Sequence, residues 1–293
     1  MESGSAVNTR SAKHRKAKKG GGLGPVRWVL FAICICVFCF SGYKLYDKYK
    51  MYKENKEAYA EINEVVIQPA SYNIPSIEQE GESTGPLPQR LANPIPEIDF
   101  AVLADMDKNA FGWLYIPDTV MNYPVVKGKD NDYYLNHALG GKWNNGGCPF
   151  VDYRNKDGFE DYNTVIYGHH LRNGMMFACL DDYAKQEFYD AHPVVYFTTE
   201  SGKYILRIFA AYTTHSTSDA YNRSFKNEEA FMNWVDKALE QSKIKTDVEI
   251  TAQDKVLTLS TCAYNFSGAR FVVHCRLDKC PQDNWYEDEW NLI

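Results

Sequence analysis

The sequence predicts a mainly β protein: a closed, mostly antiparallel β-barrel with helical inserts, preceded by an N-terminal transmembrane helix and a stalk. Nine short runs rich in β-branched and aromatic residues follow one another beyond residue 110, and Gly, Asn or Asp separates most of them. So many short strands are typical of a barrel or a sandwich. An uncharged stretch near the N-terminus and a proline-rich stretch behind it set the first part of the chain apart.

The composition indicates a folded protein and argues against nucleic-acid binding. With 293 residues, of which 45% are hydrophobic and 14% aromatic, the chain can bury a full core. The net charge is −6, although residues 1–27 are strongly basic. Because the cations gather in this one arm and form no patch on a folded face, we expect no nucleic-acid partner.

Residues 28–43, WVLFAICICVFCFSGY, carry no charge and are predicted to cross the membrane. The stretch is short for a span of about 20 residues, but the tryptophan and tyrosines at its ends can extend it. Ser41 and Gly42 lead directly into bulky residues, so an uncleaved anchor is favoured over a cleaved signal peptide. Since Lys and Arg precede the span, we expect residues 1–27 in the cytoplasm and the rest of the chain outside the cell.

Two segments separate the span from the folded domain. Residues 44–66 are rich in Tyr, Lys and Glu and contain no helix breaker, which predicts a helical stalk. Six prolines stand among Ser, Gly and Glu in residues 67–97, so we expect an extended linker there. The folded domain is predicted to cover residues 98–293 and to begin with a short helix around 100–109.

Strands and helical inserts alternate within the predicted domain. The nine strand-like runs are GWLYI, YPVV, CPFVD, NTVIYG, VVYFTT, KYILRIFAAYTT, DVEIT, KVLTLST and RFVVHCRL. Helical inserts are predicted at DNDYYLNHAL, MMFACLDDYAKQEFY and NEEAFMNWVDKALEQSK. The last insert places Phe231, Trp234, Val235 and Leu239 on one stripe, which we expect to pack against the barrel.

Eight cysteines are present, and their positions limit the disulfides that can form. Three of them, Cys34, Cys36 and Cys39, lie in the predicted span. The other five are Cys148, Cys179, Cys262, Cys275 and Cys280. Because five is an odd number, at least one thiol stays unpaired within the chain, which indicates a reactive residue or an intermolecular bond. Cys148, Cys179 and Cys275 fit buried positions, and the group around His274 lacks the paired spacing of a metal site, so we expect no metal.

The run KVLTLSTC places one cysteine on a polar strand face. Side chains alternate along a strand, so Thr258, Ser260 and Cys262 share the face opposite the two leucines. In the next run, Arg270 points away from the apolar side chains. A hairpin would therefore bring Cys262 and Arg270 close together. From the pattern alone, an ordinary buried thiol and a surface cation stay open as alternatives.

A thiol nucleophile needs a proton-transfer partner, usually a histidine that can lie far away in sequence. Among the seven histidines, His169 and His170 stand out because they follow the strongly β-forming run NTVIYG, whose final glycine lets the backbone turn. A solvated turn would explain the same pair of histidines equally well.

Together, these residues resemble the sortase transpeptidases, and class B in particular. TLSTC with an arginine downstream, and YGHH at the end of an earlier strand, match the catalytic pattern of that family. GWLYIPDTVMNYPVVKGKDNDYYLNHAL resembles a further stretch of class B, and the helix from Asn227 to Ser242 matches its long insert. The resemblance extends over residues 97–280. It implies a sortase-type barrel anchored by its N-terminus on the outer face of a Gram-positive membrane.

The resemblance also implies a role for each residue of the pattern. Cys262 would be the nucleophile that forms a thioacyl intermediate. His169, the first histidine after the glycine, would protonate the leaving amine and deprotonate the incoming one, with His170 as an alternate or supporting residue. Arg270 would hold the substrate carbonyl or the developing oxyanion. The family's substrate contacts map onto Asn131, Leu135, Thr217, Tyr221, Ser260 and Thr261.

The implied activity is that of a membrane-anchored cysteine transpeptidase that needs no cofactor. It would cleave a C-terminal sorting signal of surface proteins after threonine and pass the acyl group to an amine of a peptidoglycan precursor. An extracytoplasmic cysteine peptidase is one alternative, but such folds usually place the nucleophile at the start of a helix, whereas Cys262 ends a strand. A non-catalytic surface-binding module is another, but it would not explain TLSTC, YGHH and GARF in one chain.

Overall fold

The computed structural model describes residues 24–68, 95–262 and 267–280, and of Cys262 it describes the backbone. The chain divides into two compact units, residues 1–50 and residues 51–293. The described strands all lie in the second unit.

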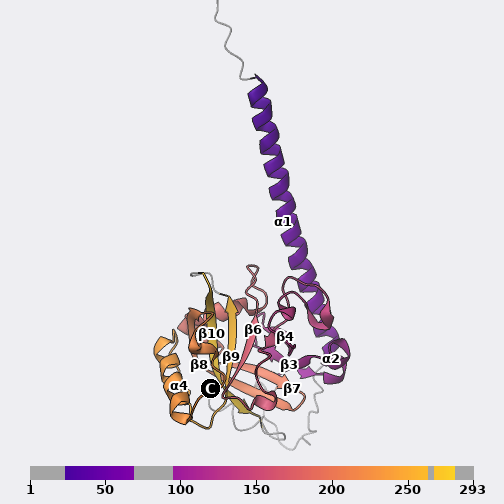
Figure 1. The fold of residues 1–293 in the computed structure, drawn as a ribbon. Helices are drawn as coiled ribbons and strands as arrows, with labels where there is room; N and C mark the ends of the chain where they lie inside the picture. Colours follow the sequence, from indigo (N-terminus) through magenta and orange to yellow (C-terminus); the bar gives the residue numbers. More distant parts are fainter. Residues whose placement is uncertain (1–23, 69–94, 263–266, 281–293) are drawn as a thin grey trace, which may run out of the picture. The chain divides into compact units, whose positions relative to one another are not determined.

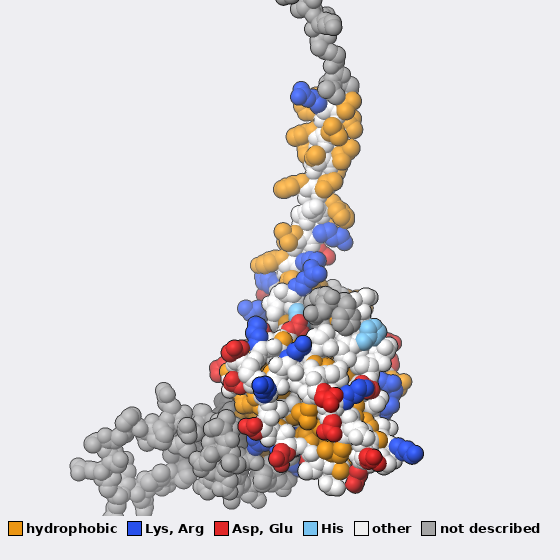
Figure 2. Space-filling view, turned by 90° about the vertical axis from the view of Figure 1, so that its left-hand side faces the viewer, with side chains coloured by type: hydrophobic (Ala, Val, Ile, Leu, Met, Phe, Trp, Pro, Cys, Tyr) orange, Lys and Arg blue, Asp and Glu red, His pale blue; other side chains and the backbone are white. Residues whose placement is uncertain are grey.

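Helix α1 (Gly24–Val66) runs through the predicted span and the predicted stalk without interruption. Large apolar side chains near its start are exposed, among them Trp28, Phe38 and Phe40. Figure 2 shows such side chains along the exposed length of the helix. Its most apolar 18-residue window has a mean hydropathy of 2.0, so by length and composition the helix can cross a membrane. This fits a membrane anchor or a signal sequence.

The end of α1 belongs to the second compact unit, which begins at Met51. One face of this part is buried and consists of Asn55, Tyr59, Ile62 and Val66. Their spacing of three and four residues is that of a single helix face, which explains why they can pack together against the barrel. The segment predicted as a separate stalk is therefore partly buried.

The two ends of the predicted linker pair with each other. β1 (Ile67–Gln68) follows α1 directly and forms a short antiparallel ladder with β2 (Glu97–Ile98). The rest of the predicted linker, residues 69–94, lies outside the described residues.

Eight strands form a closed barrel in the order β10–β8–β7–β3–β4–β5–β6–β9, as Figure 1 shows in part. They are β3 (Ala110–Tyr115), β4 (Asn122–Val126), β5 (Phe150–Val151), β6 (Asn163–Gly168), β7 (Val194–Thr199), β8 (Gly202–His215), β9 (Val256–Cys262) and β10 (Ala269–Lys279). β4 pairs in parallel with β5, and β6 with β9, whereas the other neighbours are antiparallel. The predicted mostly antiparallel barrel is confirmed.

Helices and 3-10 turns fill the connections between strands. They are α2 (Phe100–Met106), η1 (Tyr133–Leu135), η2 (Leu139–Gly141), η3 (Asp157–Phe159), η4 (Phe177–Ala184), α3 (Gln186–Ala191), η5 (Asp219–Tyr221) and α4 (Glu228–Gln241). The long insert helix is present as predicted, and Asn227 caps it by accepting a hydrogen bond from the Ala230 N–H at 2.9 Å. The first predicted insert forms short 3-10 turns, and the second begins as η4.

Strand alternation divides the core into a barrel interior and a cluster under α4. In β10, Phe271 and Val273 belong to the interior, whereas Val272 belongs to the cluster under α4. Figure 1 shows α4 beside β8, and Phe231 and Trp234 of α4 supply that cluster from the helix side. The polar face of β9 therefore lies on the outside of the barrel wall.

Two predictions are wrong in detail. DVEIT, residues 247–251, is a loop. β9 and β10 already close the barrel, so no strand edge remains for this run, and Val248 and Ile250 pack on the cluster under α4. On α4, Leu239 was predicted to pack against the barrel but is 41% exposed. Ala238 is buried in its place, together with Phe231, Trp234 and Val235.

Candidate active site

The predicted hairpin of β9 and β10 is present, and its register places Arg270 directly opposite Cys262. On the other edge of β9, Gly168 at the end of β6 pairs with Thr261. His169 follows immediately. The backbones that carry the three candidate catalytic residues therefore converge at one end of the barrel. The direction of the Cys262 side chain lies outside the part of the chain that the structure describes.

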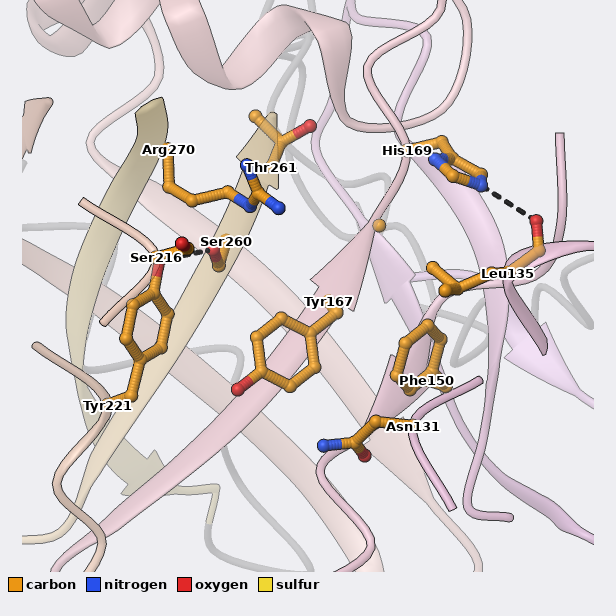
Figure 3. Close-up of a pocket in the computed structure, with 11 residues that line it drawn as sticks. Asn131, Leu135, Phe150, Tyr167, His169, Ser216, Tyr221, Ser260, Thr261 and Arg270 are labelled. Carbon is orange, nitrogen blue, oxygen red and sulfur yellow. Dashed lines mark hydrogen bonds between the residues drawn. The ribbon is translucent and has the colours of Figure 1, made fainter. Parts of the chain in front are cut away.

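A pocket of about 230 Å³ lies at this end of the barrel. The residues that line it are Asn131, Leu135, Phe150, Tyr167, Gly168, His169, Ser216, Tyr221, Ser260, Thr261 and Arg270. Figure 3 shows Arg270 and Thr261 on one side, His169 on the other, and Tyr167 between them. The pocket thus offers a cation and an imidazole on opposite sides of an aromatic surface.

His169 is held by both its ring and its backbone. Its Nε2 lies 2.7 Å from the Leu135 carbonyl oxygen, the contact dashed in Figure 3. Its own carbonyl accepts a hydrogen bond from the Phe177 N–H at 2.9 Å. Gly168 is required here, because a Cβ at this position would lie 2.4 Å from the Phe177 ring. The glycine lets β6 pass close to Phe177, which places His169 at the pocket.

Arg270 is half-buried at the opposite side of the pocket. Its Nη1 donates a hydrogen bond to the Ala269 carbonyl at 2.9 Å. Within residues 24–68, 95–262 and 267–280, no carboxylate forms an ion pair with Arg270. Its remaining donors can therefore engage a carbonyl or an oxyanion in the pocket.

An aromatic row crosses the pocket between these two groups. Tyr221 and Tyr167 have ring centroids 6.0 Å apart, and Tyr167 and Phe150 have centroids 5.5 Å apart. The Tyr221 hydroxyl lies 3.1 Å from the Ser260 hydroxyl. These contacts fix the rings as one apolar surface with a polar margin.

A buried carboxylate holds the middle of this row. Asp152 is fully buried and accepts a hydrogen bond from the Tyr167 hydroxyl at 3.0 Å. Arg154 donates to its two oxygens from Nε at 2.9 Å and from Nη2 at 2.6 Å. Burial alone would raise the pKa of Asp152, but the hydrogen bonds and charge of Arg154 outweigh it, so the pKa is lowered. Asp152 therefore stays ionised and orients Tyr167.

The structure brings most of the predicted substrate contacts together. Five line the pocket, namely Asn131, Leu135, Tyr221, Ser260 and Thr261. Thr217 does not line it, because its hydroxyl bonds to His215 Nδ1 at 2.8 Å, and Ser216 lies in the pocket wall instead. His170 is also absent from the lining and pairs with Asp181 at 3.1 Å.

Two aromatic lining residues were not predicted. Phe150, in the run CPFVD, has the sequence pattern of an ordinary core residue, and nothing in that run indicates a site. Tyr167 stands two residues before His169, at the end of the strand that leads into the histidine. That spacing could have identified Tyr167.

His274 lies outside the pocket in a buried polar network. Its Nδ1 is 2.8 Å from the Thr258 hydroxyl and its Nε2 is 3.0 Å from the Tyr212 hydroxyl. The Thr258 hydroxyl donates to Asn163 at 2.7 Å, so it accepts from His274. Burial lowers the pKa of His274 to about 3, although Asp219 acts in the opposite direction. This neutral imidazole joins β8, β9 and β10 and is not a metal ligand in the arrangement seen.

Three of the other described thiols of the barrel unit do not compete as nucleophiles. Cys148, Cys179 and Cys275 are buried as predicted, and none of them lines the pocket. Burial raises the pKa of each, that of Cys179 to about 12. They stay protonated at neutral pH and are poor nucleophiles. Among the described residues, no three His, Cys, Asp or Glu side chains are grouped so that they could hold a metal ion.

Comparison with known proteins identifies the family. A family model described as the sortase domain matches residues 114–278. The chain belongs to the sortase family. It is 32% identical to Sortase B of Staphylococcus aureus over 254 residues, which cover 86% of this chain and 95% of that relative. It is 39% identical to Sortase B of Listeria monocytogenes over 181 residues, 60% of this chain and 72% of the relative.

A solved structure agrees with the sequence relatives. The crystal structure of Staphylococcus aureus Sortase B matches this sortase with a TM-score of 0.60 and 36% identity, covering 62% of this chain and 87% of the other. The resemblance inferred from the motifs is confirmed. This sortase is a cysteine transpeptidase of the sortase B type, an enzyme that anchors surface proteins.

Proposed function

We propose that this sortase cleaves a C-terminal sorting signal after threonine and transfers the acyl group to an amine of a peptidoglycan precursor. In this proposal Cys262 is the nucleophile, His169 is the acid and base, and Arg270 stabilises the oxyanion. One observation carries it: the β9–β10 register sets Arg270 opposite Cys262 at the end of the barrel where His169 and Thr261 line a pocket.

The first half of the reaction forms a thioester. The Cys262 thiolate attacks the threonine carbonyl carbon, and the oxygen takes up the negative charge. The guanidinium of Arg270 donates to that oxygen. The peptide C–N bond then breaks, and the leaving amine takes a proton from His169.

The second half transfers the acyl group to a new amine. The incoming amine attacks the thioester carbonyl, His169 accepts the proton that this nitrogen loses, and the C–S bond breaks. Cys262 returns as a thiolate. One amide is exchanged for another, so the reaction needs no oxidant, reductant or cofactor.

The pocket suits an extended peptide as substrate. The aromatic row from Tyr221 to Phe150 offers apolar surface to side chains, and Asn131 and Ser216 add polar groups at the pocket wall. A peptide lying over Tyr167 would have His169 at one of its edges and Arg270 at the other. Arg270 could then reach the carbonyl oxygen and His169 the nitrogen of the same peptide bond.

The arrangement at the membrane is also part of the proposal. Residues 28–43 of α1 would anchor the enzyme, with residues 1–27 in the cytoplasm and the catalytic domain outside the cell. The basic residues 1–27 and the exposed apolar start of α1 support it. Protease added to intact cells should degrade the domain and leave residues 1–27 protected. Protection of the domain would contradict this orientation.

The chemical part is tested with the full chain in detergent. The enzyme is incubated with a library of sorting-signal peptides and an amine acceptor, and a threonine-like electrophile is used to trap the nucleophile for mass measurement. We expect the adduct on Cys262 and no turnover by Cys262→Ala. Retained transfer by Cys262→Ala would overturn the assignment, and peptide hydrolysis without transfer to the amine would favour a cysteine peptidase.

A further inference from the structure

The hydrogen bond of His169 determines which ring nitrogen carries its proton. Nε2 lies 2.7 Å from the Leu135 carbonyl oxygen. A carbonyl oxygen can only accept, so Nε2 carries the hydrogen, and in the neutral ring Nδ1 is then the acceptor. Figure 3 shows Nδ1 on the side of the ring toward Thr261 and Arg270. The Leu135 carbonyl therefore presents the basic nitrogen to the side of the pocket where β9 ends.

The Leu135 carbonyl belongs to η1, and side chains on both sides hold this turn. Asp130 Oδ1 accepts hydrogen bonds from the backbone N–H groups two and three residues further on, at 2.9 and 2.8 Å. The Tyr134 hydroxyl donates to Asp107 Oδ2 at 2.8 Å. The orientation of the Leu135 peptide thus depends on this local network and on the segment that packs behind it.

That segment is the turn at Gly147. The Cys148 N–H donates to the Tyr134 carbonyl at 3.0 Å. Gly147 has a φ of 60°, and a Cβ there would lie 2.3 Å from the Tyr134 oxygen and 2.8 Å from the Leu135 oxygen. Only glycine permits so close an approach. A shift of Gly147 toward η1 would therefore press on the carbonyl that holds His169.

The last turns of α1 hold Gly147 in place. Tyr59 is 3% exposed, and its hydroxyl donates to the Gly147 carbonyl. Asn55, one turn earlier, is 1% exposed and touches Gly146, where a Cβ would lie 2.9 Å from its amide nitrogen. Tyr59 also packs edge-on against Tyr123 of β4, with ring centroids 5.1 Å apart. A continuous series of contacts leads from α1 to His169.

We propose that Asn55 and Tyr59 are positioning residues for His169: through Gly147 and the Leu135 carbonyl they hold the imidazole as the Nε2–H tautomer, with Nδ1 as the atom that exchanges the proton. This inference rests on the proposed role of His169. Tyr59 and Gly147 do not line the pocket. Their replacement should therefore lower kcat and leave KM unchanged.

Two matched pairs of variants test the proposal in the full chain in detergent. Gly147→Ala puts a methyl group against the Leu135 carbonyl, whereas Gly158→Ala adds the same group at a φ of 66° with nothing within 4 Å. Tyr59→Phe removes the hydroxyl, and Tyr49→Phe makes the same change at a residue that is 63% exposed. We expect kcat to fall about 100-fold in Gly147→Ala and about fivefold in Tyr59→Phe. Both controls should stay within about twofold of the parent enzyme.

The tautomer of His169 can be measured directly, and a loss of stability alone would not change it. With ¹⁵N-labelled histidine, the ring shifts of His169 should show a protonated Nε2 and an unprotonated Nδ1, and the His169→Ala spectrum assigns the signals. Gly147→Ala and Tyr59→Phe should give a mixture of tautomers. The positioning role is overturned if Gly147→Ala and Tyr59→Phe both keep the tautomer of the parent enzyme and the kcat of their control variants. If Gly147→Ala does not fold, Tyr59→Phe alone decides whether the positioning role holds. Full activity in His169→Ala would instead overturn the proposed function.

Discussion

The two sides of the pocket are built in different ways. On one side, β9 pairs with β10 over seven residues and with β6 along its other edge, so Arg270 and the backbone of Cys262 are held by regular ladders. On the other side, His169 lies beyond the end of its strand and is held by turns, through Leu135 and Phe177. A substitution on the ladder side should therefore act through the side chain that is changed. On the turn side, changes far from the pocket should act through packing.

Removing the end of α1 is expected to have the largest effect, and it acts on the turn side. A chain that begins at Ile67 loses the buried Tyr59, Ile62 and Val66, whereas a chain that begins at Met51 keeps them. Burial of three such side chains contributes about 5 kcal/mol after allowance for residual burial in the unfolded chain. We expect urea unfolding to show this difference between the two chains.

The same pair of chains tests whether the two sides are independent. If the chain from Ile67 still folds, its Cys262 should react with a thiol reagent as in the longer chain, because the β9–β10 ladder does not contain α1. Equal stability of the two chains would show that the buried face of α1 contributes little to the domain.

Arg270→Lys should have the largest effect on the ladder side. Lysine keeps the charge but loses the planar pair of donors, so the substitution is not conservative if the guanidinium holds the substrate carbonyl. Loss of one such donor typically costs about 100- to 1000-fold in rate. We expect this loss in kcat, with hardly any change in the melting temperature. Near-normal turnover in Arg270→Lys, with reduced thiol reactivity of Cys262 in Arg270→Ala, would instead indicate an electrostatic role.

The ladder side could largely be predicted from the sequence. Alternation along KVLTLSTC and ARFVV placed Thr258, Ser260 and Cys262 on one face, and the observed register pairs Arg270 with Cys262. Strand period and a short hairpin are local rules, so a single sequence is enough to apply them. The helix of 14 residues in the insert followed from its period in the same way.

The turn side could not be predicted to the same degree. Leu135 was expected as a substrate contact, but its carbonyl also accepts the hydrogen bond of His169, 34 residues away. Gly147 gives no sign in sequence that it packs on that carbonyl, and the burial of Tyr59 depends on how the end of α1 meets the barrel. Thr217 does not line the pocket, since its hydroxyl is bonded to His215, and this local contact could not be read from the sequence. Such contacts between distant turns follow no period.

The ladder side should also lose stability in acid because of one buried histidine. Burial lowers the pKa of His274 to about 3 in the folded protein, with Asp219 opposing, whereas an unfolded histidine has a pKa of about 6.5. Above about pH 6.5, His274 is neutral in both states, so its titration takes nothing from the free energy of unfolding. As the pH falls toward 3, the unfolded state binds a proton that the folded state does not, and stability drops by about 1.4 kcal/mol per pH unit.

The variant His274→Gln lacks this titrating group and therefore isolates its effect on acid stability. Between pH 7 and pH 5 the parent enzyme should lose about 2 kcal/mol more stability than His274→Gln, as measured by urea unfolding at both values. Carboxylates such as Asp152, whose pKa is lowered, titrate below this range. If both proteins lose the same amount of stability, His274 binds a proton in the folded protein as readily as in the unfolded chain.

The smallest expected effect concerns the second histidine of the turn side. His170 Nε2 lies 3.1 Å from Asp181 Oδ2, and the aspartate side chain is 38% exposed. Burial raises the pKa of Asp181, and His170 acts in the opposite direction. Since a partly exposed ion pair contributes less than about 1 kcal/mol, His170→Asn should lower stability by no more than that and kcat by less than about threefold. His169→Ala should lose nearly all turnover. Steady-state kinetics on both variants check this order. The reverse order would move the proton transfer to His170, and the turn that presents the catalytic imidazole would then lie one residue later in the chain.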